Sequence, residues 1–389
     1  MIEASKTDEA GRRLRYGMIG GGEGAFIGDV HRKALNLDGA AALAAGCFSR
    51  DPANTRRTGA ALGIDEGRLY SDFRVMAEKE AARPDRIDFA VIVTPNNTHY
   101  GIAKAFLEAG IDVVCDKPLS VSSAQAAELA ALARSKGLLF CVTYTYTGYP
   151  MVKHAREMIM RGELGRIRFV SAQYRQEWLA QPIEADSKQA GWRTDPSQGG
   201  ASNCVGDIGS HVENLAACVT GLEIESLCAR LDTFVAGRRL DDNASIMINY
   251  KDGARGLYWT SQIAIGHDND LTLSVYGEKG SLEWRQENPN YLKLAFLDRP
   301  AALLSRGRDA LHPAAAAYNR IPGGHPEGYF EAFANIYKAF IAALRRKKAG
   351  QKLTQADIDF QTAENGLAGV RFIEKCVESS KQGAVWVKF

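Results

Sequence analysis

The chain has 389 residues, of which 46% are hydrophobic and 24% are charged. This length predicts two domains, and the composition is that of a globular protein, which argues against a disordered or fibrous chain. The 48 basic and 46 acidic residues leave a net charge of +2, so we expect no nucleic acid and no membrane as a partner, but a small molecule.

The N-terminal segment, residues 1–13, is polar and of mixed charge, and it lacks the apolar stretch of a signal peptide. No run elsewhere approaches the roughly eighteen apolar residues of a transmembrane helix. The seven cysteines are scattered and form no Cys-x-x-Cys pair, which favours neither a disulfide framework nor a zinc site. We therefore expect a cytoplasmic protein.

Short apolar runs alternate with helical patterns from Leu14 to about Val142. Strands separated by helices imply parallel pairing, so this half predicts a doubly wound α/β sheet of the dinucleotide-binding type. The helical patterns Ile102–Ala109 and Ser123–Ser135 are each closed by a glycine. The predicted strands are Tyr16–Ile19, Ala42–Phe48, Phe89–Val93, Val113–Cys115 and Leu138–Val142.

The pattern changes after Tyr149, which divides the chain into domains 1–149 and 150–389. The second domain opens with a predicted helix, Met151–Arg161, and its strands are joined by hairpin-like turns, so its sheet is predicted to be mainly antiparallel. Residues 298–328 are predicted to form a long loop. The later elements are the strands Ile167–Tyr174, Ser226–Val235, Ala244–Tyr250, Ala254–Gln262, Leu271–Gly277 and Gly280–Glu287 and the helices Tyr329–Arg346 and Ile358–Ser379.

A glycine-rich segment follows the first predicted strand and precedes a helix expected from Asp29. Glycines at such a turn let the backbone approach a pyrophosphate, but the G-x-G-x-x-G fingerprint is stretched here because its third glycine comes late. A glycine-rich turn that binds no nucleotide is the alternative. The predicted cofactor contacts in this segment are Gly20, Gly22, Glu23, Gly24, Ala25, Phe26 and Ile27.

The second strand ends at Ser49 and Arg50, where a dinucleotide-binding domain contacts the adenosine ribose. A serine and an arginine would suit a 2′-phosphate. Asp51 would instead bond the ribose of NAD, or form a solvated turn. These residues leave the choice between NAD and NADP open.

Two further segments lie at the carboxyl ends of parallel strands, where open α/β sheets bind ligands. A lone lysine at a strand end is usually a solvated charge, but the proline after Lys117 restricts this turn, so the placement of the lysine is specified. The predicted cofactor contacts in these segments are Thr94, Pro95, Asn96, His99, Asp116 and Lys117.

In the second half, two glycines precede the segment from Asp207 to His211. If residues 207–220 are a regular helix, the carboxylate and the imidazole share one face at positions i and i+4. The alternatives are a helix-terminal Asp with a core histidine, and a metal pair completed by His325. No third ligand at convincing spacing supports the metal, so no metal is predicted.

Together these segments resemble the Gfo/Idh/MocA oxidoreductases, with Asp116-Lys117-Pro118 in place of the usual Glu-Lys-Pro. The resemblance implies an N-terminal Rossmann domain that binds NAD, with NADP as the alternative. It also implies a C-terminal α+β domain whose large, open, mainly antiparallel sheet forms a homodimer or homotetramer. Lys117, Asp207 and His211 inherit the catalytic roles.

The resemblance implies hydride transfer between nicotinamide and a hydroxyl carbon of a sugar, polyol or glycoside. His211 is expected to accept the hydroxyl proton, with Asp207 orienting its ring and Lys117 bonding the same oxygen. The side chains predicted to contact the carbohydrate, each with a structural role as the alternative, are Tyr144, Tyr146, Gln176, Trp192, Arg193 and His325.

Two other functions are kept as alternative hypotheses. Some members of the family are glycosidases that use NAD catalytically, in a cycle of ring oxidation, elimination, water addition and re-reduction. A non-catalytic binding protein on the same fold is the third hypothesis, and the intact set of Lys117, Asp207 and His211 argues against it.

Overall fold

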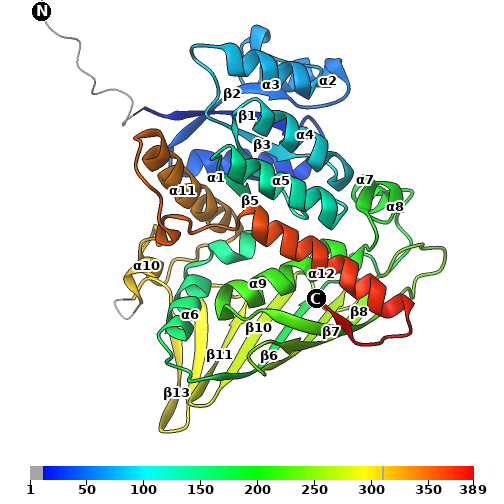
Figure 1. Ribbon diagram of the computed structural model, residues 1–389, viewed down its shortest axis with the longest axis vertical. Coiled ribbons are helices and arrows are strands. Elements are labelled where there is room, and N and C mark those ends of the chain that lie inside the picture. The colour runs from blue at the N-terminus through cyan, green and yellow to red at the C-terminus, as the bar shows by residue number, and fades with distance from the viewer. Residues whose placement is uncertain (1–11, 309–310) are drawn as a thin grey trace, which may run out of the picture.

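The computed structural model describes residues 12–308 and 311–389. Their strands form two sheets, a five-stranded sheet near the N-terminus and a nine-stranded sheet built from residue 167 onward (Figure 1). Apart from Arg12 and Arg13, the N-terminal segment for which no signal peptide is predicted lies outside the described residues. No helix within the described ranges is long and apolar enough to cross a membrane.

The first sheet is parallel throughout and has the strand order β2-β1-β3-β4-β5. The strands β3 and β4 are buried along their whole length, because helices cover both faces of the sheet, which explains their continuous apolar runs. The predicted Rossmann sheet is thereby confirmed. Its elements are β1 Leu14–Gly20, α1 Phe26–Leu37, β2 Ala41–Cys47, α2 Pro52–Ala61, α3 Phe73–Ala82, β3 Phe89–Val93, α4 Asn96–Glu108, β4 Asp112–Cys115, α5 Ser123–Ser135 and β5 Phe140–Val142.

The second sheet has the order β13-β12-β11-β10-β6-β9-β8-β7-β14. Among its described strands only β6 and β9 pair in parallel, so the prediction of a mainly antiparallel sheet is confirmed. Its strands are β6 Ile167–Arg175, β7 Ile224–Asp232, β8 Asn243–Tyr250, β9 Arg255–Ser261, β10 Asp270–Gly277, β11 Gly280–Arg285, β12 Tyr291–Phe296, β13 Arg299–Ser305 and β14 Val387–Lys388.

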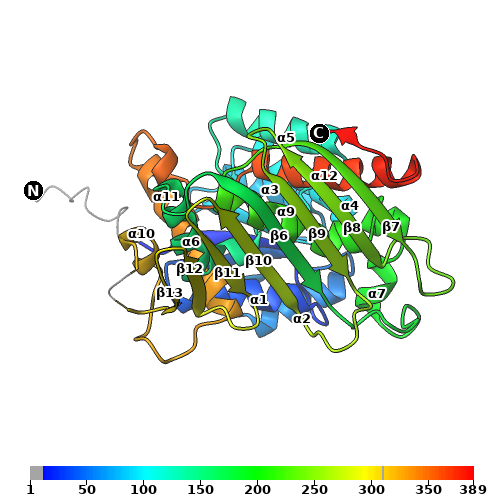
Figure 2. The ribbon, with the colours of Figure 1, turned by 90° about the horizontal axis from the view of Figure 1, so that it is seen from below.

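The helices of the described residues cover one face of this large sheet. The helices α6 Pro150–Met160 and α9 Ser210–Thr220 pack against its inner side, and α12 Ala363–Lys381 lies between the two sheets (Figure 1). Viewed from below, the strands of this sheet lie in front of α9 and α12, and no described helix crosses their near face (Figure 2). The predicted start of the last helix at residue 358 is wrong, because Thr362 and Asn365 form a capping box there.

The predicted loop over residues 298–328 is also wrong in part. Its first residues form β13, which pairs with β12 along the edge of the sheet, and Pro313–Ala316 form the short helix α10. The strand was missed because it contains Pro300, and proline argues against a strand in the interior of a sheet. At the edge of a sheet proline is tolerated, since its missing N–H faces solvent.

The chain returns to the first domain after completing the second sheet. Helix α11, Tyr329–Lys348, packs beside α1, and its Phe333, Tyr337 and Phe340 join the core formed by β1 and β3. The two parts are therefore interlocked by packing. The division of the chain at residues 149 and 150 stays a prediction.

Candidate functional site

Lys117 and Asp207 connect the two sheets. Lys117 follows β4 and forms a cis peptide bond with Pro118. Its Nζ donates to the backbone oxygen of Asp207 at 2.6 Å and to Asp207 Oδ1 at 2.9 Å. The side chains are 18% and 19% exposed, so the pair is partly open to a ligand.

Asp207 lies in a π-helical turn, Val205–Gly209, and not in a regular α-helix as predicted. The Ser210 N–H reaches the carbonyl oxygen of Val205, five residues back, and the carboxylate of Asp241 binds the Val205 N–H at 3.0 Å where the turn begins. Such π-turns are frequently found at functional sites. The turn changes the spacing that the i and i+4 argument assumed.

Three side chains hold the Asp207 carboxylate. Besides Lys117, Gln262 Nε2 donates to Oδ2 at 3.0 Å, and Arg193 Nε lies 3.4 Å from the same oxygen. Burial opposes ionisation, but the charges of Lys117 and Arg193 hold the pKa of Asp207 well below its usual range. Asp207 is therefore an anion at neutral pH.

His211 lies in the first turn of α9 and is 9% exposed. Its ring meets the edges of three tyrosines, with ring centroids 4.7 Å from Tyr146, 5.6 Å from Tyr144 and 6.1 Å from Tyr174. Burial and the charge of Lys117 lower the pKa of His211, so the neutral ring can accept a proton. Between the described residues no hydrogen bond joins Asp207 to His211, so packed aromatic rings orient the imidazole.

Polar groups from the turn at residues 145–148, from β6 and the residues after it, and from the loop before β10 lie near His211. The hydroxyls of Tyr146 and Tyr174 are hydrogen-bonded, and Tyr174 donates to Asn269 Oδ1 at 2.6 Å. Gln176 Nε2 donates to the same Asn269 oxygen at 2.7 Å, and Gln176 Oε1 accepts from Trp178 Nε1 at 3.0 Å. These amides and hydroxyls form a wall that suits a ligand with several hydroxyl groups.

Trp192 and Arg193 belong to the short helix α7, Lys188–Arg193, with α8, Pro196–Gly199, after it. The Arg193 guanidinium stacks over the Trp192 ring at 4.3 Å and also faces Asp207. The structure thus brings these two predicted contacts to the site.

Tyr144 and His325 were also predicted to contact the substrate. Tyr144 is 1% exposed, and a Cβ placed on Gly369 would lie 2.2 Å from its hydroxyl and 3.8 Å from Glu213 Oε2. The hydroxyl is therefore directed into the interior, and the Tyr144 ring supports His211 from behind. His325 is exposed on a loop that Arg306 anchors through the His325 backbone oxygen, and no described contact brings it to Lys117 or Asp207.

The glycine-rich loop has the backbone of an anion cradle. Gly20, Gly21 and Gly24 have φ angles of 85°, 72° and 82°, which favour glycine. Helix α1 begins at Phe26 rather than Asp29, so its N-terminal amides reach the loop. A Cβ on Gly28 would lie 2.3 Å from Gly21 Cα, so the late glycine of the stretched fingerprint is required for packing.

The remaining loop residues have defined partners. The Glu23 N–H lies 3.1 Å from Asn54 Oδ1 and 3.0 Å from Thr58 Oγ1, and the Glu23 carboxylate pairs with Arg57 at 2.9 Å. Arg32 donates to the Gly21 oxygen at 2.8 Å. The positive charge of Arg32 behind the loop also suits a pyrophosphate.

The residues after β2 were predicted to contact the adenosine ribose, through Asp51 or through Ser49 and Arg50. Asp51 caps α2 by accepting from the backbone N–H groups of Ala53 at 2.9 Å and Asn54 at 3.3 Å. Its role is therefore accounted for by the helix. Ser49 accepts from the Asp51 N–H at 3.1 Å, while Arg50 is exposed beside it.

The segment after β3 contacts the short helix α8 of the second half of the chain. Pro95 is the N-cap residue of α4, Thr98 Oγ1 donates to Thr94 Oγ1 at 2.7 Å, and Asn96 Nδ2 donates to the Gly199 oxygen at 3.2 Å. The buried ring of His99 lies between the backbone oxygens of Thr94 at 2.8 Å and Pro118 at 2.9 Å. Both ring nitrogens of His99 are therefore engaged by loop backbone, and its predicted contact with the cofactor stays a prediction.

Several site residues carry no local signal in the sequence. Gln262 and Asn269 are single amides at strand ends, and only the folded sheet brings them to Asp207 and Tyr174. Asp116 was predicted, but its partners His31 and Thr143 were not. The best available indication of such a site residue in the sequence would have been its position directly after a buried strand.

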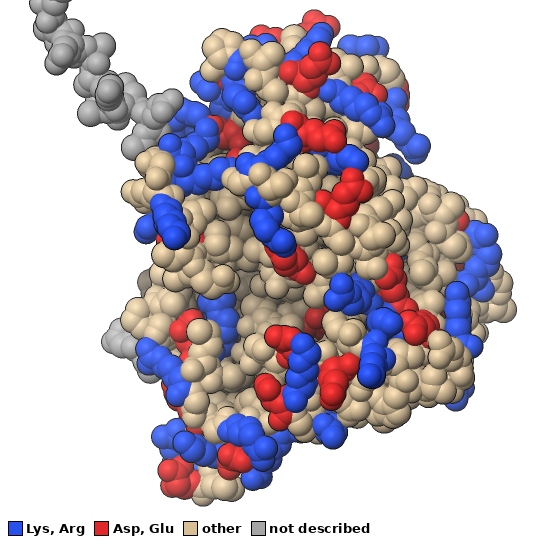
Figure 3. All heavy atoms as spheres, in the orientation of Figure 1, with Lys and Arg blue, Asp and Glu red and all other residues tan. Residues whose placement is uncertain are grey.

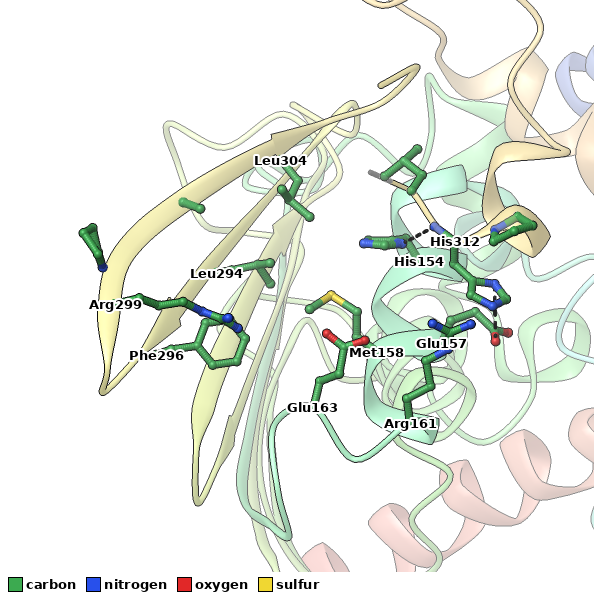
Figure 4. A pocket seen from close by; sticks show the side chains of 14 residues that line it. His154, Glu157, Met158, Arg161, Glu163, Leu294, Phe296, Arg299, Leu304 and His312 are labelled. Carbon is green, nitrogen blue, oxygen red and sulfur yellow. Dashed lines mark hydrogen bonds and ion pairs between the residues drawn. The ribbon is translucent and has the colours of Figure 1, made fainter. Parts of the chain in front are cut away.

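A separate pocket of about 410 Å³ lies between α6 and the strands β12 and β13 (Figure 4). It mixes apolar side chains with His154, Glu157, Arg161 and Glu163, and none of the predicted site residues lines it. Basic and acidic side chains are interspersed over the face drawn in Figure 3. Within the described part of the chain, no group of three His, Cys, Asp or Glu side chains could hold a metal ion.

Comparison with known proteins places this geometry in a family. Residues 14–144 match an oxidoreductase family with an NAD-binding Rossmann fold, and residues 152–283 match the GFO/IDH/MocA C-terminal domain. An uncharacterized oxidoreductase of Bacillus subtilis strain 168, YfiI, is 37% identical over 383 residues, which are 97% of each chain. Levoglucosan dehydrogenase of Pseudarthrobacter phenanthrenivorans is 28% identical over 318 residues, 73% of this chain and 77% of that one.

Solved structures agree. An inositol dehydrogenase homolog from Azotobacter vinelandii in complex with NAD+ is 38% identical, with a TM-score of 0.94 over 100% of both chains. The same homolog in complex with NADH and myo-inositol has a TM-score of 0.90 and 38% identity over 97% of this chain and 98% of that chain. The chain therefore belongs to the Gfo/Idh/MocA family of oxidoreductases and carries its NAD-binding Rossmann fold.

Proposed function

We propose that this chain is an NAD-dependent dehydrogenase of a cyclic polyol or sugar. The observation that carries the proposal is the meeting of Lys117, Asp207 and His211 beside a wall of amides and hydroxyls. The inositol dehydrogenase homolog and levoglucosan dehydrogenase support a cyclic substrate with several hydroxyl groups.

The residues present fit the cofactor. The left-handed glycines, the exposed N-terminus of α1 and Arg32 would hold the pyrophosphate, and Ser49 with Arg50 borders the ribose. A bound nicotinamide would supply the acceptor for a hydride from the alcohol carbon, and in its reduced form the donor for the reverse reaction.

Proton transfer is assigned to His211. Its neutral ring accepts the hydroxyl proton as the carbonyl forms, and gives the proton back in the reverse direction. The Lys117 ammonium donates a hydrogen bond to the reacting oxygen and stabilises the negative charge that develops there. Asp207 holds that ammonium in place, so we assign Asp207 to orienting Lys117.

We assign binding of the substrate ring to the other side chains that were predicted to contact it. Tyr146, Gln176 and Arg193 offer donors and acceptors to the hydroxyl groups that do not react, and Trp192 offers an apolar ring face. These interactions fix the distance between the alcohol carbon and the cofactor, which is a large part of catalysis.

The open face of the nine-stranded sheet supports a homodimer or homotetramer. Phe169, Leu257 and Met247 lie on adjacent strands of this face and are 37%, 45% and 47% exposed. Large exposed apolar groups close together favour an interface, and measurement of the molar mass in solution tests this assignment.

The proposal is tested by incubating the enzyme with NAD+ and a panel of inositols, pyranoses and anhydrosugars. We expect NADH to accumulate with a subset of cyclic polyols. Aryl glycosides with trace NAD+ form the second arm, in which release of aglycone in large excess over cofactor, without NADH, would contradict the proposal in favour of the glycosidase. Absence of turnover in both arms would favour the binding protein.

A further inference from the structure

A buried chain of hydrogen bonds ends at the residue before the catalytic lysine. Asp116 Oδ1 lies 2.5 Å from Thr143 Oγ1 and 3.1 Å from His31 Nε2, and His31 Nδ1 lies 2.5 Å from the Tyr337 hydroxyl. These four side chains come from the end of β4, the segment after β5, α1 and α11. These hydrogen bonds thus link α1 and α11 to the carboxylate of Asp116.

The His31 imidazole is held by hydrogen bonds and by packed aromatic rings. The His31 side chain is 0% exposed, and its ring packs at 4.8 Å from Phe333 and 5.8 Å from Tyr337. Both ring nitrogens are within hydrogen-bond distance of a partner. Such a ring has little freedom to turn, so it holds Asp116 in one orientation.

Among these four hydrogen-bonded side chains, the Asp116 carboxylate is the one that borders the reaction site. Its side chain is 16% exposed, in contrast to His31, and only its Oδ1 is used by His31 and Thr143. The titratable groups close enough for an electrostatic interaction with Asp116 include His31, His99, His211, Tyr329 and Tyr337. Lys117 continues the same turn toward Asp207.

The surroundings favour the ionised carboxylate. Burial alone would raise the pKa of Asp116, but the charge and hydrogen bond of His31 and the hydroxyl of Thr143 lower it below its ordinary value. A fixed carboxylate at the edge of a partly buried site acts on a ligand charge more strongly than it would in water.

We propose that Asp116, held by Thr143 and by the buried pair of His31 and Tyr337, makes the site bind oxidised nicotinamide more tightly than reduced nicotinamide. The oxidised ring carries a positive charge and the reduced ring is neutral, so a nearby anion distinguishes the two forms. His31 and Tyr337 are positioning residues in this assignment. The proposal rests on the proposed function in placing the nicotinamide beside Lys117.

The test measures cofactor affinity without any polyol. The Kd of NAD+ is measured by calorimetry and that of NADH by its fluorescence, for the wild type, Asp116→Asn and Tyr337→Phe. In Asp116→Asn we expect the ratio of the NAD+ Kd to the NADH Kd to rise about tenfold, because one charge is removed. In Tyr337→Phe we expect a smaller rise in the same direction, because His31 loses one partner and the ring volume is kept.

The matched control is Tyr258→Phe, which removes a buried tyrosine hydroxyl that is hydrogen-bonded to Tyr250 in the C-terminal sheet. We expect this variant to keep the wild-type ratio. An unchanged ratio in Asp116→Asn, or equal weakening of both forms, would overturn the proposal, as would a control that shifts the ratio as far as Tyr337→Phe. Thermal melting identifies a variant that fails to fold, and Tyr337→Phe then decides.

The measurement is independent of the substrate. If no polyol is turned over, the proposed function fails while the ratio of cofactor affinities still tests Asp116. If polyols are turned over and the ratio does not move, the dehydrogenase stands and the role of Asp116 falls.

Discussion

Lys117 Nζ lies 2.9 Å from Asp207 Oδ1 and 2.6 Å from the Asp207 backbone oxygen. One ammonium group therefore joins the end of a parallel strand in the Rossmann domain to a π-turn in the C-terminal domain. Because each partner is supplied by a different sheet, the geometry at this point depends on how the two domains pack.

The first prediction concerns Lys117. We expect Lys117→Ala to lower kcat by about a hundred- to ten-thousandfold, because a positioned donor to the reacting oxygen is lost. The affinity for dinucleotide should stay within a few-fold, which separate titrations can establish. Lys117→Arg is the matched control for charge, and near-normal turnover in Lys117→Ala would remove the lysine from the mechanism.

The second prediction concerns Gln262, which donates to Asp207 Oδ2 at 3.0 Å and accepts from Asn203 at 2.7 Å. Gln262→Leu removes a hydrogen bond to a charged group, so we expect kcat to fall about tenfold or more while NAD+ affinity is kept. Gln351→Leu, at an exposed glutamine far along the chain, is the control. A fall in the thermal midpoint without a change in kcat would assign Gln262 to stability alone.

These two residues show how far the sequence could lead. Lys117 was predictable because it follows a buried apolar strand and precedes a proline, both of which are local features. Gln262 was not, because only the register of β8 and β9 and the turn at Asp207 bring it to the carboxylate. The π-turn itself was mistaken for a regular helix because no residue pattern marks a single extra residue in a turn.

The same limit applied to the outer parts of the molecule. The parallel strands were visible as uninterrupted apolar runs, since both faces are covered. The edge strand β13 was missed because five of its residues are exposed and one is proline, which leaves no alternation to detect. Tyr144 was assigned to substrate because the sequence cannot show toward which side a hydroxyl is directed.

The third prediction concerns Glu213, whose carboxylate is buried in α9 and has an oxygen without a partner. Burial raises the pKa of Glu213 to about 8, so the folded state keeps a proton that the unfolded state loses above its ordinary pKa of 4.5. Folding stability should therefore fall as the pH rises between these values, by about 1.4 kcal/mol per pH unit, and become level above the folded pKa.

Glu213→Gln removes this dependence. The difference in unfolding free energy between the variant and the wild type should increase in favour of the variant as the pH is raised from about 5 to 8, as measured by thermal melting at several pH values. Glu108→Gln, at an exposed glutamate, is the control. A difference that does not change with pH would show that Glu213 is ionised in the folded protein.

The fourth prediction concerns cofactor choice at Arg50. NAD should bind more tightly than NADP, in keeping with the NAD+ and NADH complexes of the relatives. If the exposed guanidinium contacts a 2′-phosphate, Arg50→Ala should weaken NADP far more than NAD, because a charge-assisted hydrogen bond is lost for NADP alone. Equal losses for both dinucleotides, measured by titration, would refute this contact.

The fifth prediction concerns Asp51, whose carboxylate accepts from the N–H groups of Ala53 and Asn54 at the start of α2. If the cap is its role, Asp51→Ala should cost about 1 kcal/mol of stability and leave NAD affinity within a few-fold. Asp51→Asn keeps an oxygen that can cap the helix, so it should retain the wild-type thermal midpoint. A carboxylate that also bonds the adenosine ribose would instead be revealed by a large fall of NAD affinity in Asp51→Ala. The two variants, compared by melting and by NAD titration, therefore separate the helix cap from the ribose contact.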